Sequence, residues 1–442
     1  MQGSPLLKRN GKRHLNVMFA DLSYLNRHTV SAQYVPLGIG LIAQYAKKQF
    51  GDDIKVSLFK NIDKFLNQAT QNPPDVVGLS VYYWNIAKSQ YLIKCLREKF
   101  GRDIIIVIGG PTFDSDEAEQ HMCLTEMFPD ADAICINEGE IGFSNVIRKI
   151  LENRKTAFKD HIEGVSFLDG NNLVQGFVGN RTGLSMDLET MGSPYLSGLL
   201  DEFMNSDNQP LVQTSRSCPY SCTFCVAGKN RGKLRGYPIE QIKEELKYVS
   251  KKYADKPLHT MYIVDENFGI LKRDKDLALK FAENKKKFGY PNRFGVCYTK
   301  NSTEKVFEVA KIFDDVGVQR GVSLNMQSMD KETLKNIKRD NIKMEFFKSL
   351  QRKYVEAGIA TYTEFILPLP GETYESWKRG MNQLLDSSQH SGLLVYNVNV
   401  MPNAELGDKN YLKKYKIETV NIPLFQSHSA KSLDESLFIR DS

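Results

Sequence analysis

Short apolar runs alternate with longer amphipathic segments over the first third of the chain. The apolar runs are rich in Val and Ile, which is typical of strands that helices cover on both faces. They predict five strands, at residues 15–20, 54–59, 75–80, 104–108 and 133–136. Between them, residues 37–46 and 86–100 carry apolar side chains at helical spacing. This alternation predicts an α/β fold with a doubly wound parallel sheet.

Residues 160–210 have a different pattern. Two apolar runs, at 164–168 and 173–178, flank an Asp-Gly-Asn-Asn turn, and they predict a β-hairpin. Gly192-Ser193-Pro194 and the polar run 205–208 interrupt regular structure. The segment is therefore interpreted as a connector between two domains.

The alternation resumes at residue 211. Six predicted strands are separated by long helical patterns, and they lie at residues 211–214, 260–264, 293–298, 318–324, 361–367 and 393–400. Six such repeats predict a partial (β/α)6 barrel, in which chemistry takes place at the C-terminal ends of the strands.

These patterns divide the chain into four parts. We predict a Rossmann-like domain over 13–155, the connector over 156–210, the barrel over 211–402 and a C-terminal extension over 403–442. The extension has no clear domain of its own, and we interpret it as a shortened form of a longer region.

Composition narrows the class of protein. The chain has 442 residues and a net charge of +6, from 59 basic and 53 acidic residues, with only short basic clusters, so a nucleic-acid partner is not favoured. No apolar run approaches the roughly 20 residues that a membrane helix needs. The apolar stretch near the N-terminus is too short for a signal peptide, which predicts a cytoplasmic protein without a membrane partner.

The cysteines supply the candidate chemistry. Of seven cysteines, Cys218, Cys222 and Cys225 lie together in a Cys-x3-Cys-x2-Cys loop directly after the first predicted barrel strand. Three thiolates on one loop can each bind one iron of a 4Fe–4S cluster and leave the fourth iron open to a chelating substrate. Two alternatives remain at this point: a zinc site, which usually needs a fourth ligand, and three packed core cysteines.

The loop resembles the signature of the radical SAM superfamily, whose cluster cleaves S-adenosylmethionine (SAM). The similarity covers residues 212–402 and implies that Cys218, Cys222 and Cys225 are both the catalytic residues and the metal ligands. It also implies SAM contacts at the ends of successive barrel strands, namely at Phe224, Asp265, Glu266, Ser323, Gln327 and Glu364.

The N-terminal half resembles the cobalamin-binding domain of class B radical SAM enzymes. The residues that carry this resemblance, and that it implies for cobalamin binding, are Pro36, Leu37, Ser80, Gly109, Gly110 and Glu138. The sequence departs from the Asp-x-His-x-x-Gly motif of many cobalamin domains, because His28 does not stand at that spacing. We interpret His28 as a surface histidine, so that cobalamin would be bound without a protein ligand below cobalt.

The resemblance implies a radical SAM enzyme, and most readily a cobalamin-dependent methyltransferase. Its cofactors would be a 4Fe–4S cluster, SAM and cobalamin, and its substrate a small molecule or peptide with an unactivated centre. An electron donor such as flavodoxin or ferredoxin would be its partner. The alternatives are rearrangement, cyclisation or oxidation without methyl transfer, a tRNA methylthiotransferase, and a non-catalytic cobalamin sensor.

Overall fold

The computed structural model describes residues 8–9, 12–26, 29–31, 33–113, 116–177, 186–228, 233–319, 321–387 and 392–420. The chain divides between Phe203 and Met204 into two compact units, which are described separately below. None of the helices in these described ranges is long and apolar enough to cross a membrane.

The first unit is built on a seven-stranded sheet with the order β11-β10-β9-β8-β7-β3-β6. Its strands are β3 (Leu15–Ala20), β6 (Ile54–Phe59), β7 (Val76–Ser80), β8 (Ile105–Gly109), β9 (Ala133–Cys135), β10 (Val165–Asp169) and β11 (Asn172–Val174). The first five are parallel, as predicted. The strand order reverses between β3 and β7, and open α/β sheets bind ligands at such a switch point.

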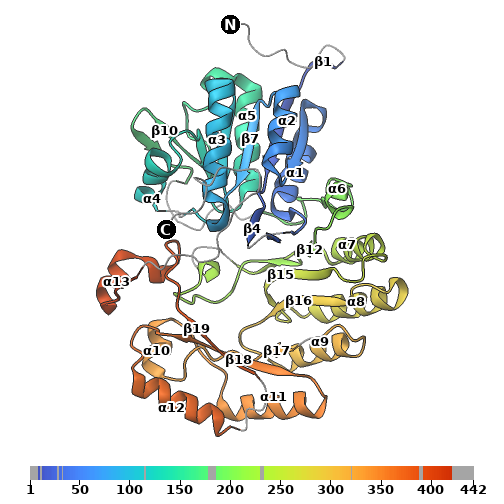
Figure 1. The fold of residues 1–442 in the computed structure, drawn as a ribbon, viewed down its shortest axis with the longest axis vertical. Helices are drawn as coiled ribbons and strands as arrows, with labels where there is room; N and C mark the ends of the chain where they lie inside the picture. Colours follow the sequence, from blue (N-terminus) through green and yellow to red (C-terminus); the bar gives the residue numbers. More distant parts are fainter. Residues whose placement is uncertain are drawn as a thin grey trace. The chain divides into compact units, whose positions relative to one another are not determined.

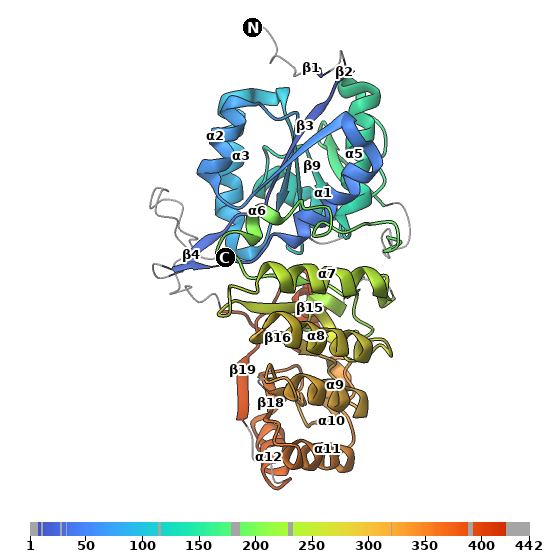
Figure 2. The ribbon, with the colours of Figure 1, turned by 90° about the vertical axis from the view of Figure 1, so that its right-hand side faces the viewer.

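Helices cover both faces of this sheet (Figures 1 and 2). One face carries α1 (Leu37–Phe50) and α5 (Gly139–Asn153), and the other carries α2 (Ile62–Gln71), α3 (Ile86–Phe100) and α4 (Glu117–Met122). Successive side chains of β3 point to opposite faces of the sheet. Met18 joins the core beneath α2 and α3, whereas the Phe19 ring lies 4.6 Å from the Phe143 ring of α5. Two short hairpins, β1–β2 (Lys8–Arg9, Lys12–Arg13) and β4–β5 (Tyr24–Asn26, Thr29–Ser31), complete the strands of this unit.

The predicted connector differs from the structure. Residues 165–174 form the expected hairpin, but β10 pairs antiparallel with β9 and extends the sheet of the first unit. Val165 and Phe167 of β10 are fully buried, so the hairpin has an apolar face that requires a partner. The following segment also packs on this unit, where the Leu200 side chain lies against Gly40 of α1. The unit boundary therefore lies at residue 203, inside the predicted connector.

The second unit contains six parallel strands in two groups of three, β12-β15-β16 and β17-β18-β19. The strands are β12 (Leu211–Val212), β15 (Thr260–Phe268), β16 (Arg293–Tyr298), β17 (Val322–Ser323), β18 (Thr361–Leu367) and β19 (Gly392–Asn397). The helices are α6 (Asp201–Met204) at the unit boundary, α7 (Ile239–Lys252), α8 (Asp274–Phe288), α9 (Glu304–Asp314), α10 (Lys331–Asn336), α11 (Met344–Glu356) and α12 (Tyr374–Leu385). Helices and strands alternate along the chain, and α7, α8 and α9 lie side by side (Figure 1).

Two elements of this unit were not predicted. A short antiparallel ladder joins β13 (Ser215–Arg216) to β14 (Arg235–Gly236) and closes the segment that contains the three clustered cysteines. The predicted C-terminal extension contains helix α13 (Lys409–Tyr415), and residues up to 419 belong to the compact second unit. Both elements adjoin the cysteine loop.

Candidate functional site

The cysteine loop follows β13 at the carboxyl end of the first barrel strand. The backbone of Ser217 adopts φ +77°, which turns the chain sharply before Cys218. Cys218 and Cys222 are buried and Cys225 is half-buried. The Cys225 amide donates to the Cys222 carbonyl at 3.2 Å, so the last two cysteines share one tight turn.

Hydrogen-bond donors and cations surround two of the thiols. The Asn267 amide nitrogen lies 3.0 Å from Cys218 Sγ. The Arg339 guanidinium interacts electrostatically with the Cys222 thiol, and Lys300 Nζ lies 3.9 Å from the same sulfur. Donors and positive charges stabilise a thiolate relative to a thiol, and the thiolate is the form that binds metal. The donor set of the loop therefore fits a thiolate-bound iron–sulfur cluster.

The structure also addresses the zinc alternative. A single zinc ion needs several ligands that converge on one point. Within the described ranges, no three His, Cys, Asp or Glu side chains are grouped so that they could hold one metal ion. Thiolates that each bind a different iron of a cluster do not need to converge in this way. The preference for a cluster therefore rests on the spacing of the three cysteines.

Two carboxylates lie on the inner side of the barrel strands. Glu364 of β18 is hydrogen-bonded to the Asn325 side chain and interacts with the charge of Arg339. Burial raises the pKa of Glu364, and both of these contacts oppose that rise. Burial, followed by the carboxylates of Glu364 and Glu266, raises the pKa of the Cys297 thiol on β16. Glu266, Cys297 and Glu364 therefore share one environment.

Asp265 is hydrogen-bonded to the residues that lead into the cysteine loop. Its carboxylate accepts hydrogen bonds from the Thr214 amide at 2.6 Å, the Thr214 hydroxyl at 2.5 Å and the Ser215 hydroxyl at 2.8 Å. Burial raises its pKa, while these hydrogen bonds lower it. Both oxygens are thus committed to the residues that lead into the cysteine loop. The pairing of β15 with β16 shifts register between Ile263 and Phe268, and within this stretch Glu266 acts on the Cys297 thiol more strongly than Asp265 does.

The other residues predicted to contact SAM also lie near the strand ends. Gln327 is buried at φ +63°, its amide donates to the Glu364 carbonyl at 2.9 Å, and its side-chain oxygen has no partner in the described part of the chain. Ser323 of β17 is hydrogen-bonded to Tyr362. The Phe224 ring lies beneath Lys300, with Nζ 5.7 Å from the ring centroid. Gln327 and Glu364 are therefore adjacent, and Lys300 links Phe224 to Cys222.

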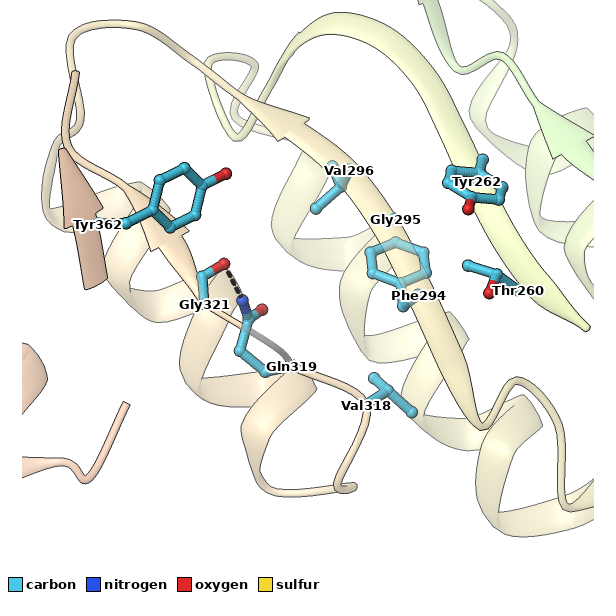
Figure 3. A pocket seen from close by; sticks show the side chains of 9 residues that line it. All are labelled: Thr260, Tyr262, Phe294, Gly295, Val296, Val318, Gln319, Gly321 and Tyr362. Carbon is cyan, nitrogen blue, oxygen red and sulfur yellow. Dashed lines mark hydrogen bonds between the residues drawn. The ribbon is translucent and has the colours of Figure 1, made fainter. Parts of the chain in front are cut away.

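A cavity of about 250 Å³ lies at the opposite ends of the strands (Figure 3). Its lining residues are Thr260, Tyr262, Phe294, Gly295, Val296, Val318, Gln319, Gly321 and Tyr362. The Gln319 amide is already bound to the Gly321 carbonyl at 2.7 Å, and the Tyr262 ring packs where a side chain on Gly295 would lie. None of the predicted site residues lines this cavity.

In the first unit, the residues predicted to bind cobalamin gather at the carboxyl edge of the sheet. Ser80 and Gly109 are register partners at the ends of β7 and β8. At Gly110, φ is +126°, and an added Cβ would lie 2.5 Å from the Val81 carbonyl oxygen, so this glycine is required by the strand-to-strand contact itself. Glu138 precedes α5, and its carboxylate accepts the Met186 amide at 2.8 Å.

The remaining features of this edge are structural. Pro36 precedes the first turn of α1, and Leu37 is buried within it. Sequence reasoning missed Asn85, which is fully buried and whose side chain accepts from the Tyr82 amide at 2.8 Å and donates to the Ser80 carbonyl at 3.0 Å. His28 lies outside the described residues.

The burial of Lys88 in α3 predicts that the stability of the protein depends on pH. Its side chain is buried, and Nζ donates to the Ser23 carbonyl at 2.6 Å, just after β3. Burial lowers the pKa of Lys88 from 10.5 to about 8. Between these pH values the unfolded chain binds a proton that the native protein has released, so this group makes stability rise with pH. Lys88→Met should abolish that rise.

The measurement is the urea midpoint of the Lys88→Met variant and of the parent protein on both sides of this pH window. Lys94→Met, which changes an exposed lysine of the same helix, is the matched control. If the urea midpoint of Lys88→Met changes with pH as much as that of the parent, the native protein does not lower the pKa of Lys88.

Comparisons with known proteins agree with both halves of the site. Residues 25–147 match the B12 binding domain family, and residues 212–384 match the radical SAM superfamily. The chain therefore contains a B12-binding domain followed by a radical SAM domain. It is 30% identical, over 91% of its length, to a cobalamin-dependent radical SAM methyltransferase, TokK, from Streptomyces tokunonensis. It is 31% identical, over the same share, to 2-(S-pantetheinyl)-carbapenam-3-carboxylate methyltransferase from Streptantibioticus cattleyicolor.

Solved structures show the same fold. The radical SAM methyltransferase TsrM from Kitasatospora setae, with tryptophan and a SAM analogue bound, has a TM-score of 0.66 at 17% identity and covers 95% of this chain and 79% of its own. The chain spans 59% of the length of each of the two curated relatives.

The predicted family and fold are confirmed by these comparisons. The cobalamin-binding domain precedes the radical SAM domain, and the cofactors that this family uses are the predicted 4Fe–4S cluster, SAM and cobalamin. These matches are between whole domains, so the roles of individual residues in binding SAM and cobalamin stay predictions.

Proposed function

We propose that this protein is a cobalamin-dependent radical SAM methyltransferase that acts on an unactivated centre of a small molecule or peptide. The observation that carries the proposal is the buried thiol loop beside Asn267, Arg339 and Lys300. Its support is the match to methyltransferases over both units of the chain. When bound, the cofactors would supply the electron that cleaves SAM to a 5′-deoxyadenosyl radical, and a methyl group from cobalamin.

The residues of the chain would bind and orient these groups. Cys218, Cys222 and Cys225 would hold the cluster and leave one iron for SAM. Glu266 and Glu364 are the carboxylates placed to accept hydrogen bonds from the SAM amino group or ribose. The loops after β7, β8 and β9 would hold cobalamin at the switch point of the sheet.

A small-molecule substrate is favoured by the relatives. One relative is named for a carbapenam carboxylate, and the TsrM structure contains tryptophan as substrate. We further propose that the protein is cytoplasmic and receives its electron from a flavodoxin or ferredoxin. We propose no membrane or nucleic-acid partner for the protein.

The tRNA methylthiotransferase alternative has less support in the structure. A second cluster would need three more cysteines that are ready to bind iron. Cys123 and Cys135 are buried, and burial raises the pKa of each thiol to about 12. Cys95 is part of α3. Cys123 and Cys135 are therefore protonated packing groups rather than cluster ligands.

The proposal is tested by anaerobic reconstitution of the full chain with iron, sulfide and methylcobalamin. We expect about four irons per chain and, after addition of dithionite and SAM, release of 5′-deoxyadenosine. SAM with a labelled methyl group should pass its label to cobalamin and then to a component of a small-molecule cell extract. About eight irons per chain would favour a methylthiotransferase. Release of 5′-deoxyadenosine by protein that binds no cobalamin would exclude methyl transfer but keep the radical SAM assignment.

A further inference from the structure

Arg339 is a buried cation beside the cysteine loop, and no motif assigns it a role. It lies after α10 and is 5% exposed. Its guanidinium donates to the Asn325 carbonyl at 2.7 Å and to the Asn341 side chain at 3.2 Å. It also interacts electrostatically with the Cys222 thiol and with Glu364. A single cation thus connects a predicted iron ligand to a carboxylate of the inner strands.

The segment that carries this cation is fixed against the cysteine loop. The Thr223 amide donates to the Ile337 carbonyl at 3.1 Å, and the Leu406 amide donates to the Thr223 carbonyl at 2.8 Å. The Tyr411 hydroxyl of α13 donates to the Asn336 carbonyl at 2.8 Å and lies 3.1 Å from the Thr223 hydroxyl. These contacts hold the backbone next to Cys222 from two sides. The segment that carries Arg339 is therefore held beside the cysteine loop.

We infer that Arg339 is a positioning residue that stabilises the charge on the Cys222 thiolate and thereby sets the reduction potential of the 4Fe–4S cluster. The inference rests on the cluster of the proposed function. Arginine stays charged when buried, and charge interactions are stronger in a protein interior than in water. The reduced cluster carries one more negative charge than the oxidised cluster, so a neighbouring cation favours reduction.

Glu364 supplies an opposing charge. Its carboxylate interacts with the Arg339 guanidinium, and its own negative charge disfavours reduction of a nearby cluster. Removing the Glu364 charge should therefore shift the potential in the direction opposite to that caused by removing Arg339. A residue with only a structural role would not produce such a pair of opposite shifts.

The experiment is a reductive titration of the reconstituted full chain, followed by the electron paramagnetic resonance signal of the reduced cluster. Dithionite donates one electron to each cluster, no bond is broken, and SAM is not present. Iron per chain is measured first, so that only loaded protein is compared. The variants are Arg339→Gln, Arg339→Lys and Glu364→Gln. Lys338→Gln removes the same charge from the neighbouring position, where the side chain is 53% exposed and pairs with Glu405, and it serves as the matched control.

At the midpoint potential of the parent protein, we expect the ratio of reduced to oxidised cluster in Arg339→Gln to fall roughly tenfold, a shift of about 59 mV for one electron. Arg339→Lys should fall between that variant and the parent, Glu364→Gln should shift the other way, and Lys338→Gln should match the parent. An unchanged potential in loaded Arg339→Gln overturns the inference. If Arg339→Gln does not load iron, an unchanged or lowered potential in Glu364→Gln overturns it instead. Absence of iron from the parent protein would instead be a failure of the proposed function.

Discussion

Cys222→Ala should lower the iron content of the reconstituted protein from about four atoms per chain to nearly none. Cys222 is buried in the middle of the loop, where it interacts electrostatically with Arg339 and lies near the charge of Lys300. Its removal deletes one of three iron ligands and leaves a buried cation without its sulfur partner. Formation of 5′-deoxyadenosine from SAM should fall to the background of the assay, because two of the three thiolates do not suffice to hold the cluster.

The matched control is Cys95→Ala. Cys95 lies in α3 of the first unit and is half-buried, so the substitution removes the same thiol group without touching the loop. We expect this variant to keep about four irons per chain and full SAM cleavage. Iron analysis, the visible absorption of the cluster and 5′-deoxyadenosine yield measure both variants. A Cys222→Ala protein that retains four irons would place the cluster elsewhere, and iron loss in Cys95→Ala would support a second cluster.

The sequence was sufficient to predict the elements whose hydrophobic periodicity is strong. The predicted strands at 15–20, 54–59, 293–298 and 361–367 coincide with β3, β6, β16 and β18. These strands are mostly buried or belong to sheets that helices cover. The pattern of apolar residues in the sequence therefore agrees with the environment that the fold provides. The hairpin at 165–174 was also predicted, but its pairing with β9 was not. Turn residues determine a hairpin locally, whereas its sheet partner is determined by contacts distant in sequence.

The site could be predicted only where a short motif carries it. The three cysteines stand within one loop, and their spacing alone indicates a cluster. Arg339 and Tyr411 contact the same loop but lie far from it along the chain, and neither belongs to a motif. Asp265 and Glu266 were both predicted to contact SAM. Asp265 is committed to hydrogen bonds with Thr214 and Ser215, which distinguishes it from Glu266, while a contact of either carboxylate with SAM stays a prediction.

Asp265→Ala should destabilise the second unit by about 3 kcal/mol, because it leaves three buried donors of Thr214 and Ser215 without an acceptor. Asp265→Asn retains one acceptor oxygen and should cost about half as much. The chain has two tryptophans, Trp84 in the first unit and Trp377 in the second, so urea unfolding followed by Trp377 fluorescence in a Trp84→Phe background reports on the second unit alone. Asp255→Ala, at an exposed position of the same unit, should change its stability by less than about 0.5 kcal/mol.

The same variants separate the two carboxylates of β15 by function. If Asp265 anchors the loop, Asp265→Asn that has been loaded with a cluster should bind SAM with nearly the affinity of the parent protein, because the Asp265 oxygens are already bound by Thr214 and Ser215. Glu266→Gln should show the reverse, with weaker SAM binding and a change in stability of less than about 0.5 kcal/mol. Equilibrium binding of SAM to loaded protein measures the first quantity and urea unfolding the second. Weaker SAM binding in Asp265→Asn without loss of stability would instead return Asp265 to the SAM site and contradict the hydrogen bonds that tie it to Thr214 and Ser215.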